Sequence, residues 1–144
     1  AYQRALLPQR SGMRVVGRPC PLWVTLAEQG GSTGELADAI LLDGVRGLVR
    51  SNEAPNASST LLLGCTHFPV FRSRLQQLLG AQVQVIDSAQ TTASAVAKAL
   101  QADGLLFDGG AATQFLATDG VDRFCRVGAT FLGESISSVE LIDL

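Results

Sequence analysis

The chain has 144 residues, of which 47% are hydrophobic, and its formal net charge is −2 at pH 7. This length fits one ordinary domain or two small lobes, and the apolar content excludes a disordered chain. Lys and Arg are scattered without runs, so no nucleic-acid partner is expected, and no apolar stretch approaches the roughly 20 residues of a membrane-spanning helix.

Short apolar runs alternate with segments of helical periodicity along the chain. The first half predicts a strand at 13–20, a helix at 34–51 that contains Gly44 and Gly47, a polar loop at 51–60 and a strand at 60–65. The second half predicts helices at 69–80, 91–103 and 121–133 and strands at 83–87, 112–119 and 138–144. Because strand and helix alternate, we expect an α/β fold with three layers and a mainly parallel sheet.

The three cysteines, Cys20, Cys65 and Cys125, are odd in number and widely spaced. This spacing argues against a disulfide framework and, with a single histidine, against a metal site. We therefore expect reduced thiols in a cytoplasmic protein and no metal ion. Cys125 falls on the apolar side of the predicted helix 121–133, where core packing is the expected role.

The sequence LGCTHFP at 63–69 lies where a buried strand is expected to end and the next helix to begin. Ligands of parallel α/β folds bind at this edge of the sheet. Free N–H groups at the helix start would stabilise a thiolate at Cys65 and could hold a carboxylate, to which Thr66 could add a hydrogen bond. His67 is close enough to Cys65 to shuttle a proton or to shift the pKa of the thiol, which could then act as general acid–base or as nucleophile.

These residues also have purely structural interpretations. Cys65 could be a small buried side chain and His67 a structural imidazole. Glu28, followed by QGGSTG, could be a solvated loop carboxylate. Asp87 and Ser88 follow the strand 83–87 and are expected to cap the next helix. Trp23 is expected in the core or at the edge of a pocket.

The stretch LLLGCTHFPVFRSRLQQLLGAQVQVIDSAQTTA at 61–93 resembles the C-terminal active-site region of the glutamate racemases. That family has L-G-C-T-H-Y-P followed by I-D-S, and here Phe68 replaces the usual tyrosine. GRPCPLWVTLAEQG at 17–30 resembles the family's C-P-L-F-V-P-L-V-E-E-G segment, and FLATDGVDRFCRVGATFLG at 115–133 resembles its closing segment. The resemblance covers almost the whole chain.

The resemblance implies a cofactor-independent isomerase in which two cysteines, one from each of two similar domains, flank the Cα of glutamate. Its product, D-glutamate, would serve peptidoglycan synthesis, and hence the cell wall and cell shape. By this resemblance Cys65 is a catalytic thiol, Thr66 contacts the substrate and His67 assists the thiol. Glu28 matches a glutamate near that histidine, and Cys20 belongs to a packing motif and is expected to be buried and inert.

The family's first cysteine lies in an N-terminal region with D-S-G-x-G-G-L and C-N-T-A motifs, which do not occur in these 144 residues. We therefore expect a C-terminal portion that does not racemise glutamate by itself. Residues 1–89 would form the lobe with the Cys-Thr-His motif, and residues 90–144 would complete the other lobe.

Glutamate is the expected small-molecule partner, and a homodimer is one assembly that this interpretation allows. Three alternatives stay open: a racemase of aspartate or a related amino acid, a Cys-His hydrolase or acyl-transferase with Cys65 as nucleophile, and an inactive carboxylate-binding lobe.

Overall fold

The computed structural model describes residues 2–10, 12–48, 59–107, 109–110 and 112–143. The first part of the chain contains α1 (Tyr2–Leu6), the 3₁₀ helix η1 (Leu7–Gln9), α2 (Pro21–Glu28), α3 (Glu35–Val45) and β1 (Ser59–Leu63). The 3₁₀ helix η2 (Phe68–Phe71), α4 (Arg72–Leu79), β2 (Val83–Asp87), α5 (Ser88–Ala102), β3 (Leu116–Ala117), α6 (Val121–Leu132) and β4 (Glu140–Leu141) follow. Every strand pairs in parallel, and the predicted α/β class is confirmed.

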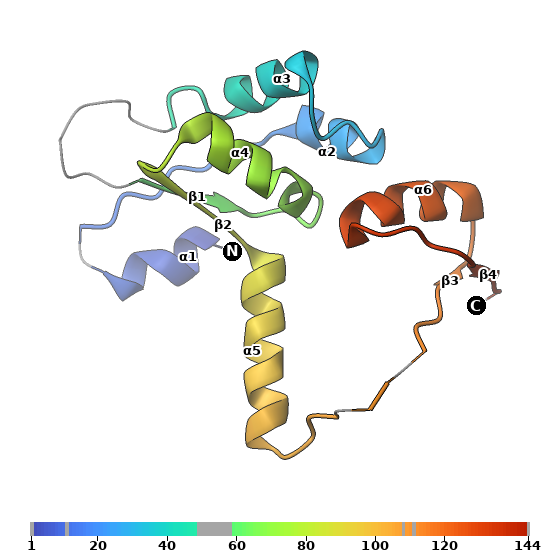
Figure 1. The fold of residues 1–144 in the computed structure, drawn as a ribbon. Coiled ribbons are helices and arrows are strands. Elements are labelled where there is room, and N and C mark those ends of the chain that lie inside the picture. The colour runs from blue at the N-terminus through green and yellow to red at the C-terminus, as the bar shows by residue number, and fades with distance from the viewer. Residues whose placement is uncertain (1, 11, 49–58, 108, 111, 144) are drawn as a thin grey trace.

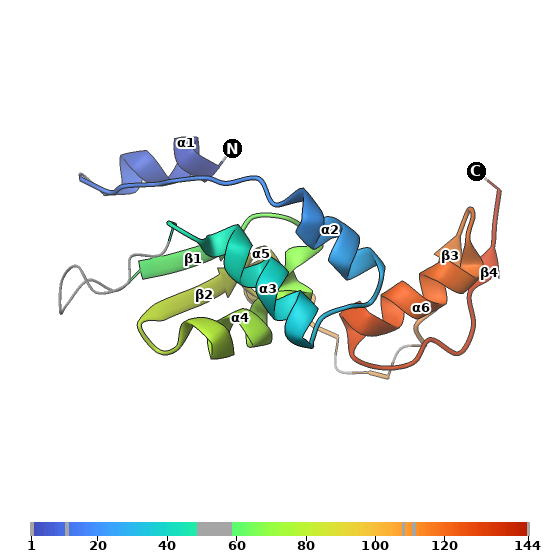
Figure 2. The same ribbon diagram turned by 90° about the horizontal axis from the view of Figure 1, so that it is seen from above.

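The lobe up to β2 is built on the parallel pair β1–β2, in which Leu61 is opposite Val85. Helices α2, α3 and α4 lie on one side of this pair, and α1 lies on the other (Figures 1 and 2). The buried core therefore sits between the strands and the three helices. It consists of Trp23, Ala27, Leu41, Val45, Leu63, Phe71, Leu75 and Val85.

Helix α3 contains a glycine for a packing reason. A Cβ at Gly44 would lie only 2.5 Å from Nε1 of Trp23, so a side chain there would collide with the buried indole. The helix ends at Val45, short of the predicted 51, and Gly47 just beyond it has a φ of 74°, a conformation that favours glycine. Glycine is a poor helix former, but Gly44 is the residue that lets α2 pack closely on α3.

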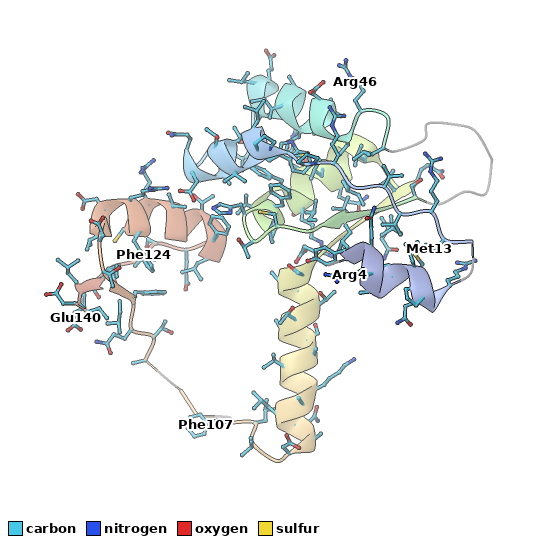
Figure 3. All side chains as sticks on the ribbon, turned by 180° about the vertical axis from the view of Figure 1, so that it is seen from behind. Arg4, Met13, Arg46, Phe107, Phe124 and Glu140 are labelled. Atoms are coloured by element: carbon cyan, nitrogen blue, oxygen red, sulfur yellow. The ribbon has the colours of Figure 1, made fainter. Side chains whose placement is uncertain are left out.

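The chain leaves the lobe through α5, which has no buried residue and projects away from the strands (Figure 1). An irregular connection follows, on which Phe107 stands apart from the lobe (Figure 3). The short pair β3–β4 and helix α6 form a small C-terminal unit, and α6 contacts η2. This arrangement brings α6 next to the end of α2 (Figure 2).

Three strand predictions need correction. Residues 13–20 form no strand, because within the described residues this segment pairs with neither β1 nor β2. The strands predicted at 112–119 and 138–144 shrink to two residues each. The strands form two separate two-stranded sheets in place of one continuous sheet. The predicted loop at 51–60 falls mostly outside the described residues.

In the part of the chain that the structure describes, no helix combines the length and the apolar character that crossing a membrane requires.

Candidate functional site

The Cys-Thr-His motif lies at the carboxyl end of β1, as the sequence predicted. Cys65, Thr66 and His67 follow the strand after Gly64, and the N–H of Phe68 donates to the carbonyl of Cys65 at 3.2 Å, which starts the turn into η2. The element that follows is thus a 3₁₀ turn, and α4 begins only at Arg72. Cys65 and His67 are half-buried and Thr66 is exposed, so the motif is accessible from solvent.

His67 connects the thiol to a carboxylate. Its Nδ1 lies 3.8 Å from Sγ of Cys65 and 3.5 Å from Oγ1 of Thr66. Its Nε2 lies 2.6 Å from Oε1 of Glu28, although these residues are 39 positions apart in the sequence. With Nε2 donating to the carboxylate, Nδ1 is turned toward the thiol. The structure therefore brings together the four residues that the sequence singled out.

Glu28 is the last residue of α2, where the carbonyl end of the helix dipole disfavours a negative charge. Two positively polarised partners offset this disadvantage. His67 contacts one carboxylate oxygen, and Nη2 of Arg123, from α6, donates to the other, Oε2. The carboxylate is thus held from both sides. Glu28 is therefore not the solvated loop carboxylate that was the alternative interpretation of its sequence context.

Arg123 is a site residue that sequence reasoning missed. It lies 95 positions from Glu28, and no local motif marks it. The only signal was its place within the closing segment that resembles the racemases. Phe131 of the same helix also reaches the site, because its ring meets the ring of His67 edge-on with 6.1 Å between the centroids.

The protonation of this chain of groups follows from its contacts. Burial, the largest single influence, raises the pKa of the Cys65 thiol, but hydrogen bonds from the backbone and ring of His67 outweigh it and the net pKa is lowered. The hydrogen bond to Glu28, followed by that to Cys65, raises the pKa of His67. Arg123, followed by His67, lowers the pKa of Glu28. All three directions favour a thiolate beside an imidazolium.

One hollow adjoins the motif at Thr66, and another adjoins Glu28. An open groove of about 630 Å³ begins at Thr66 and Pro69, passes the start of α5 at Ser88, and runs along the apolar face of that helix to Leu106. A second hollow, of about 470 Å³, lies between Glu28 and the face of α6 that carries Arg123 and Phe131. Thr66 therefore borders a space large enough for a small amino acid.

The remaining predicted residues have structural roles. Asp87 is buried, its Oδ1 accepts from the N–H of Gln90 at 2.9 Å, and it caps α5 as predicted, while Ser88 is the first residue of that helix. Trp23 is only 3% exposed and belongs to the core. Its hydrogen bond from Nε1 to the carbonyl of Ile40, at 3.2 Å, ties α2 to α3.

Neither of the other cysteines resembles Cys65. Cys20 is half-buried with its Sγ 3.8 Å from the carbonyl of Gly44, and burial raises the pKa of its thiol. Cys125 is also half-buried, and the prediction that it packs in a core is wrong because α6 has no buried residue. Among the described residues, no group of three or more His, Cys, Asp or Glu is placed to hold a metal ion.

Comparison with known proteins gives one consistent result. The whole chain aligns with the glutamate racemase of Koribacter versatilis at 33% identity and with that of Lysinibacillus sphaericus at 32%, covering 56% and 53% of those proteins. The chain is homologous to the second half of the glutamate racemases. No protein-family model matches it.

The fold of this racemase homologue agrees with solved structures. Glutamate racemase isoform RacE1 from Bacillus anthracis superposes on 99% of the chain with a TM-score of 0.77 and 28% identity, and the chain covers 52% of it. The glutamate racemase from Thermus thermophilus, in complex with β-chloro-D-alanine, matches 87% of the chain with a TM-score of 0.67 and 32% identity, and 46% of that protein is covered. The chain thus spans about half the length of the relatives that it matches.

Proposed function

We propose that this chain is one half of a glutamate racemase and that Cys65 exchanges the α-proton of glutamate on one face. The observation that carries the proposal is the Cys65–His67–Glu28 chain of contacts at the end of β1. A thiol whose pKa is lowered toward neutral pH can both remove and return a proton, which general acid–base catalysis requires. The racemase homologues support the substrate, since one glutamate racemase of this fold is described in complex with D-glutamate.

The chemistry assigns a task to each residue. The Cys65 thiolate takes the proton from Cα and becomes a thiol, and the electron pair of the broken C–H bond stays on Cα and its carboxylate. His67, held by Glu28, stabilises the thiolate before the transfer. Thr66, exposed at the mouth of the groove, binds the substrate carboxylate, where charge develops.

Racemisation requires a second acid on the opposite face of Cα, because a single base returns the proton to the face from which it came. Cys20 does not fill this role, since its Sγ faces backbone carbonyls on the α3 side of the lobe. The opposite thiol would come from a part of the protein outside these 144 residues. The chain covers about half of its relatives, which leaves room for such a part.

The division of the chain supports this arrangement. Residues 1–89 hold the Cys-Thr-His motif and the main core, and most of the exposed large apolar side chains of the described residues lie in 90–144. On α5 and the connection after it, these include Val96, Leu105, Leu106 and Phe107. Exposed apolar surface of this kind marks an interface. We infer that residues 90–144 complete the lobe that supplies the second thiol.

The wider biological role follows from the same proposal. The reaction needs no cofactor, and D-glutamate would enter peptidoglycan synthesis in the cytoplasm and so serve the cell wall and cell shape. A homodimer is compatible with it.

Proton exchange in D₂O tests the proposal. Each enantiomer of glutamate is incubated with the chain, and deuterium at Cα is followed by ¹H NMR. We expect slow exchange of one enantiomer, which Cys65→Ser abolishes, and no racemisation. Exchange absent both from the chain and from a longer protein with both halves would overturn the proposal, and full racemisation by the 144 residues alone would overturn the two-base mechanism. Parallel incubations with aspartate test the related amino-acid racemases.

A second candidate is a hydrolase or acyl-transferase, because Cys65, His67 and Glu28 also have the order of a nucleophile, a base and its orienting carboxylate. Incubation with an activated acyl ester followed by mass spectrometry separates the two. An acyl group trapped on Cys65 supports the acyl-transferase, and proton exchange without a trapped acyl group supports the racemase.

A further inference from the structure

Helix α6 contacts the catalytic chain of groups at two points. Arg123 donates to Oε2 of Glu28, and the ring of Phe131 meets the ring of His67. These residues are two helical turns apart, so they share one face of α6. That face also lines the hollow above Glu28. A helix from the far end of the chain thus touches both members of the Glu28–His67 pair.

We propose that Arg123 is a positioning residue of the Cys65 site. Its guanidinium holds Oε2 of Glu28, so that Oε1 stays on His67. Arg123 thereby couples the placement of α6 to the geometry of the Cys65–His67 pair. The proposal deepens the proposed function and rests on it for its catalytic meaning.

The need for such a residue comes from the location of Glu28. The side chain has several rotatable bonds, is 26% exposed and projects from the C-terminal end of α2, where the helix dipole repels it. Within the described residues, Arg123 is the only partner of Oε2. Without it, the carboxylate gains rotamers in which Oε1 no longer faces His67.

A second, opposite effect of Arg123 makes the proposal testable. As a cation, Arg123 disfavours a positive charge on His67, so a purely electrostatic role predicts that removing it raises the pKa of His67. A positioning role predicts the reverse, because a released Glu28 no longer stabilises the imidazolium. The charged groups around the pair are Arg123, the Cys65 thiol, and Asp119, which lines the same hollow and whose Oδ1 accepts from the N–H of Gly120 at 2.6 Å.

His67 is the only histidine of the chain, so NMR follows its titration through a single imidazole signal. In Arg123→Ala we expect the pKa of His67 to fall by about one unit, the size expected when one close carboxylate is lost. In Arg123→Lys the pKa of His67 should fall less than in Arg123→Ala, because lysine keeps a donor near Oε2. Glu28→Gln should give the full fall, and adding Arg123→Ala to it should give no further fall. Arg126→Ala is the matched control, because Arg126 is exposed on α6 and its side chain has no polar partner within the described residues.

The rate at which iodoacetamide modifies Cys65 at fixed pH supplies a second measurement. It should fall in Arg123→Ala and Glu28→Gln and stay unchanged in Arg126→Ala. A His67 pKa that rises or stays constant in a folded Arg123→Ala variant overturns the proposal, and so does a pKa that falls as far in Arg123→Lys as in Arg123→Ala. Neither measurement involves turnover, so a positioning role and the racemase assignment can fail separately.

Discussion

Replacing Gly44 by alanine should destabilise the lobe, although alanine is the better helix former. The new Cβ would lie 2.5 to 2.7 Å from three atoms of the Trp23 indole. Carbon atoms in contact are separated by about 3.5 Å or more, so the ring must move by about 1 Å. Trp23 is 3% exposed and packs edge-on against Phe68 and Phe71, at centroid distances of 5.0 and 6.0 Å. Little free space is left for that movement.

The expected cost follows from these contacts. Overpacking of this kind costs about 1–3 kcal/mol, and weakening the Trp23–Ile40 hydrogen bond adds about 1 kcal/mol. The higher helix propensity of alanine, compared with glycine, offsets about 1 kcal/mol of this cost. We therefore expect the free energy of unfolding of Gly44→Ala to fall by about 1–3 kcal/mol, and the thermal midpoint to fall by roughly 4–10 °C for a chain of this size.

Trp23 is the only tryptophan of the chain, so its fluorescence reports unfolding from within the perturbed core. Gly128→Ala is the matched control, because on α6 the new Cβ would collide only with the flexible end of Ile136, at 2.6 Å, and would lie in ordinary contact with Phe124 at 3.9 Å; stability should stay the same or rise. A Gly44→Ala variant as stable as the parent would refute this account of α2–α3 packing. Since Phe68 adjoins His67, the His67 imidazole signal should also shift in Gly44→Ala.

Three further predictions concern reactivity, pH and capping. At neutral pH, iodoacetamide should modify Cys65 roughly tenfold or more faster than Cys20, because His67 lowers the pKa of the Cys65 thiol and burial raises the pKa of the Cys20 thiol. Peptide mapping by mass spectrometry measures both rates, and equal rates would contradict the site geometry. The folded state raises the pKa of His67 above its ordinary 6.5, so the stabilisation by the protonated imidazole is complete below pH 6.5 and is lost as the pH rises through the folded pKa. In urea unfolding, His67→Asn should therefore lower the free energy of unfolding more at about pH 5.5 than at about pH 8.5. A cost that does not depend on pH would argue against the ion pair with Glu28. Asp87→Ala removes a buried N-cap from α5 and should lower the free energy of unfolding by about 1–2 kcal/mol in the same urea assay. Asp103→Ala, at the other end of the helix, should be neutral or slightly stabilising. Similar effects of the two variants would exclude a capping role for Asp87.

Much of the fold could be predicted because its signals are local. The helix ending at Gly80 begins with a proline turn, and the strand Val83–Asp87 is followed by its own capping carboxylate. These patterns depend on neighbouring residues alone, since helical periodicity and free N–H groups act over a few positions. The same local signals placed Cys65, Thr66 and His67 at the end of a strand. The residues around them also carried the likeness to the racemases.

Strand formation was predicted less well, because a strand exists only with a partner. The apolar segment 13–20 has the composition of a strand, yet neither β1 nor β2 pairs with it. Its side-chain pattern says nothing about whether another segment offers free N–H and carbonyl groups alongside.

The sequence by itself determined which residues can do chemistry and that the thiol, hydroxyl and imidazole lie together at the start of a turn. Only the tertiary structure decided what surrounds them: it brought Glu28 across 39 positions to His67 and Arg123 across 95 positions to Glu28. Such contacts depend on how α2 and α6 are oriented on the lobe, and that orientation comes from packing such as the fit of Trp23 over Gly44. The proton-transfer site is therefore local in its reactive atoms and long-range in the groups that set their protonation.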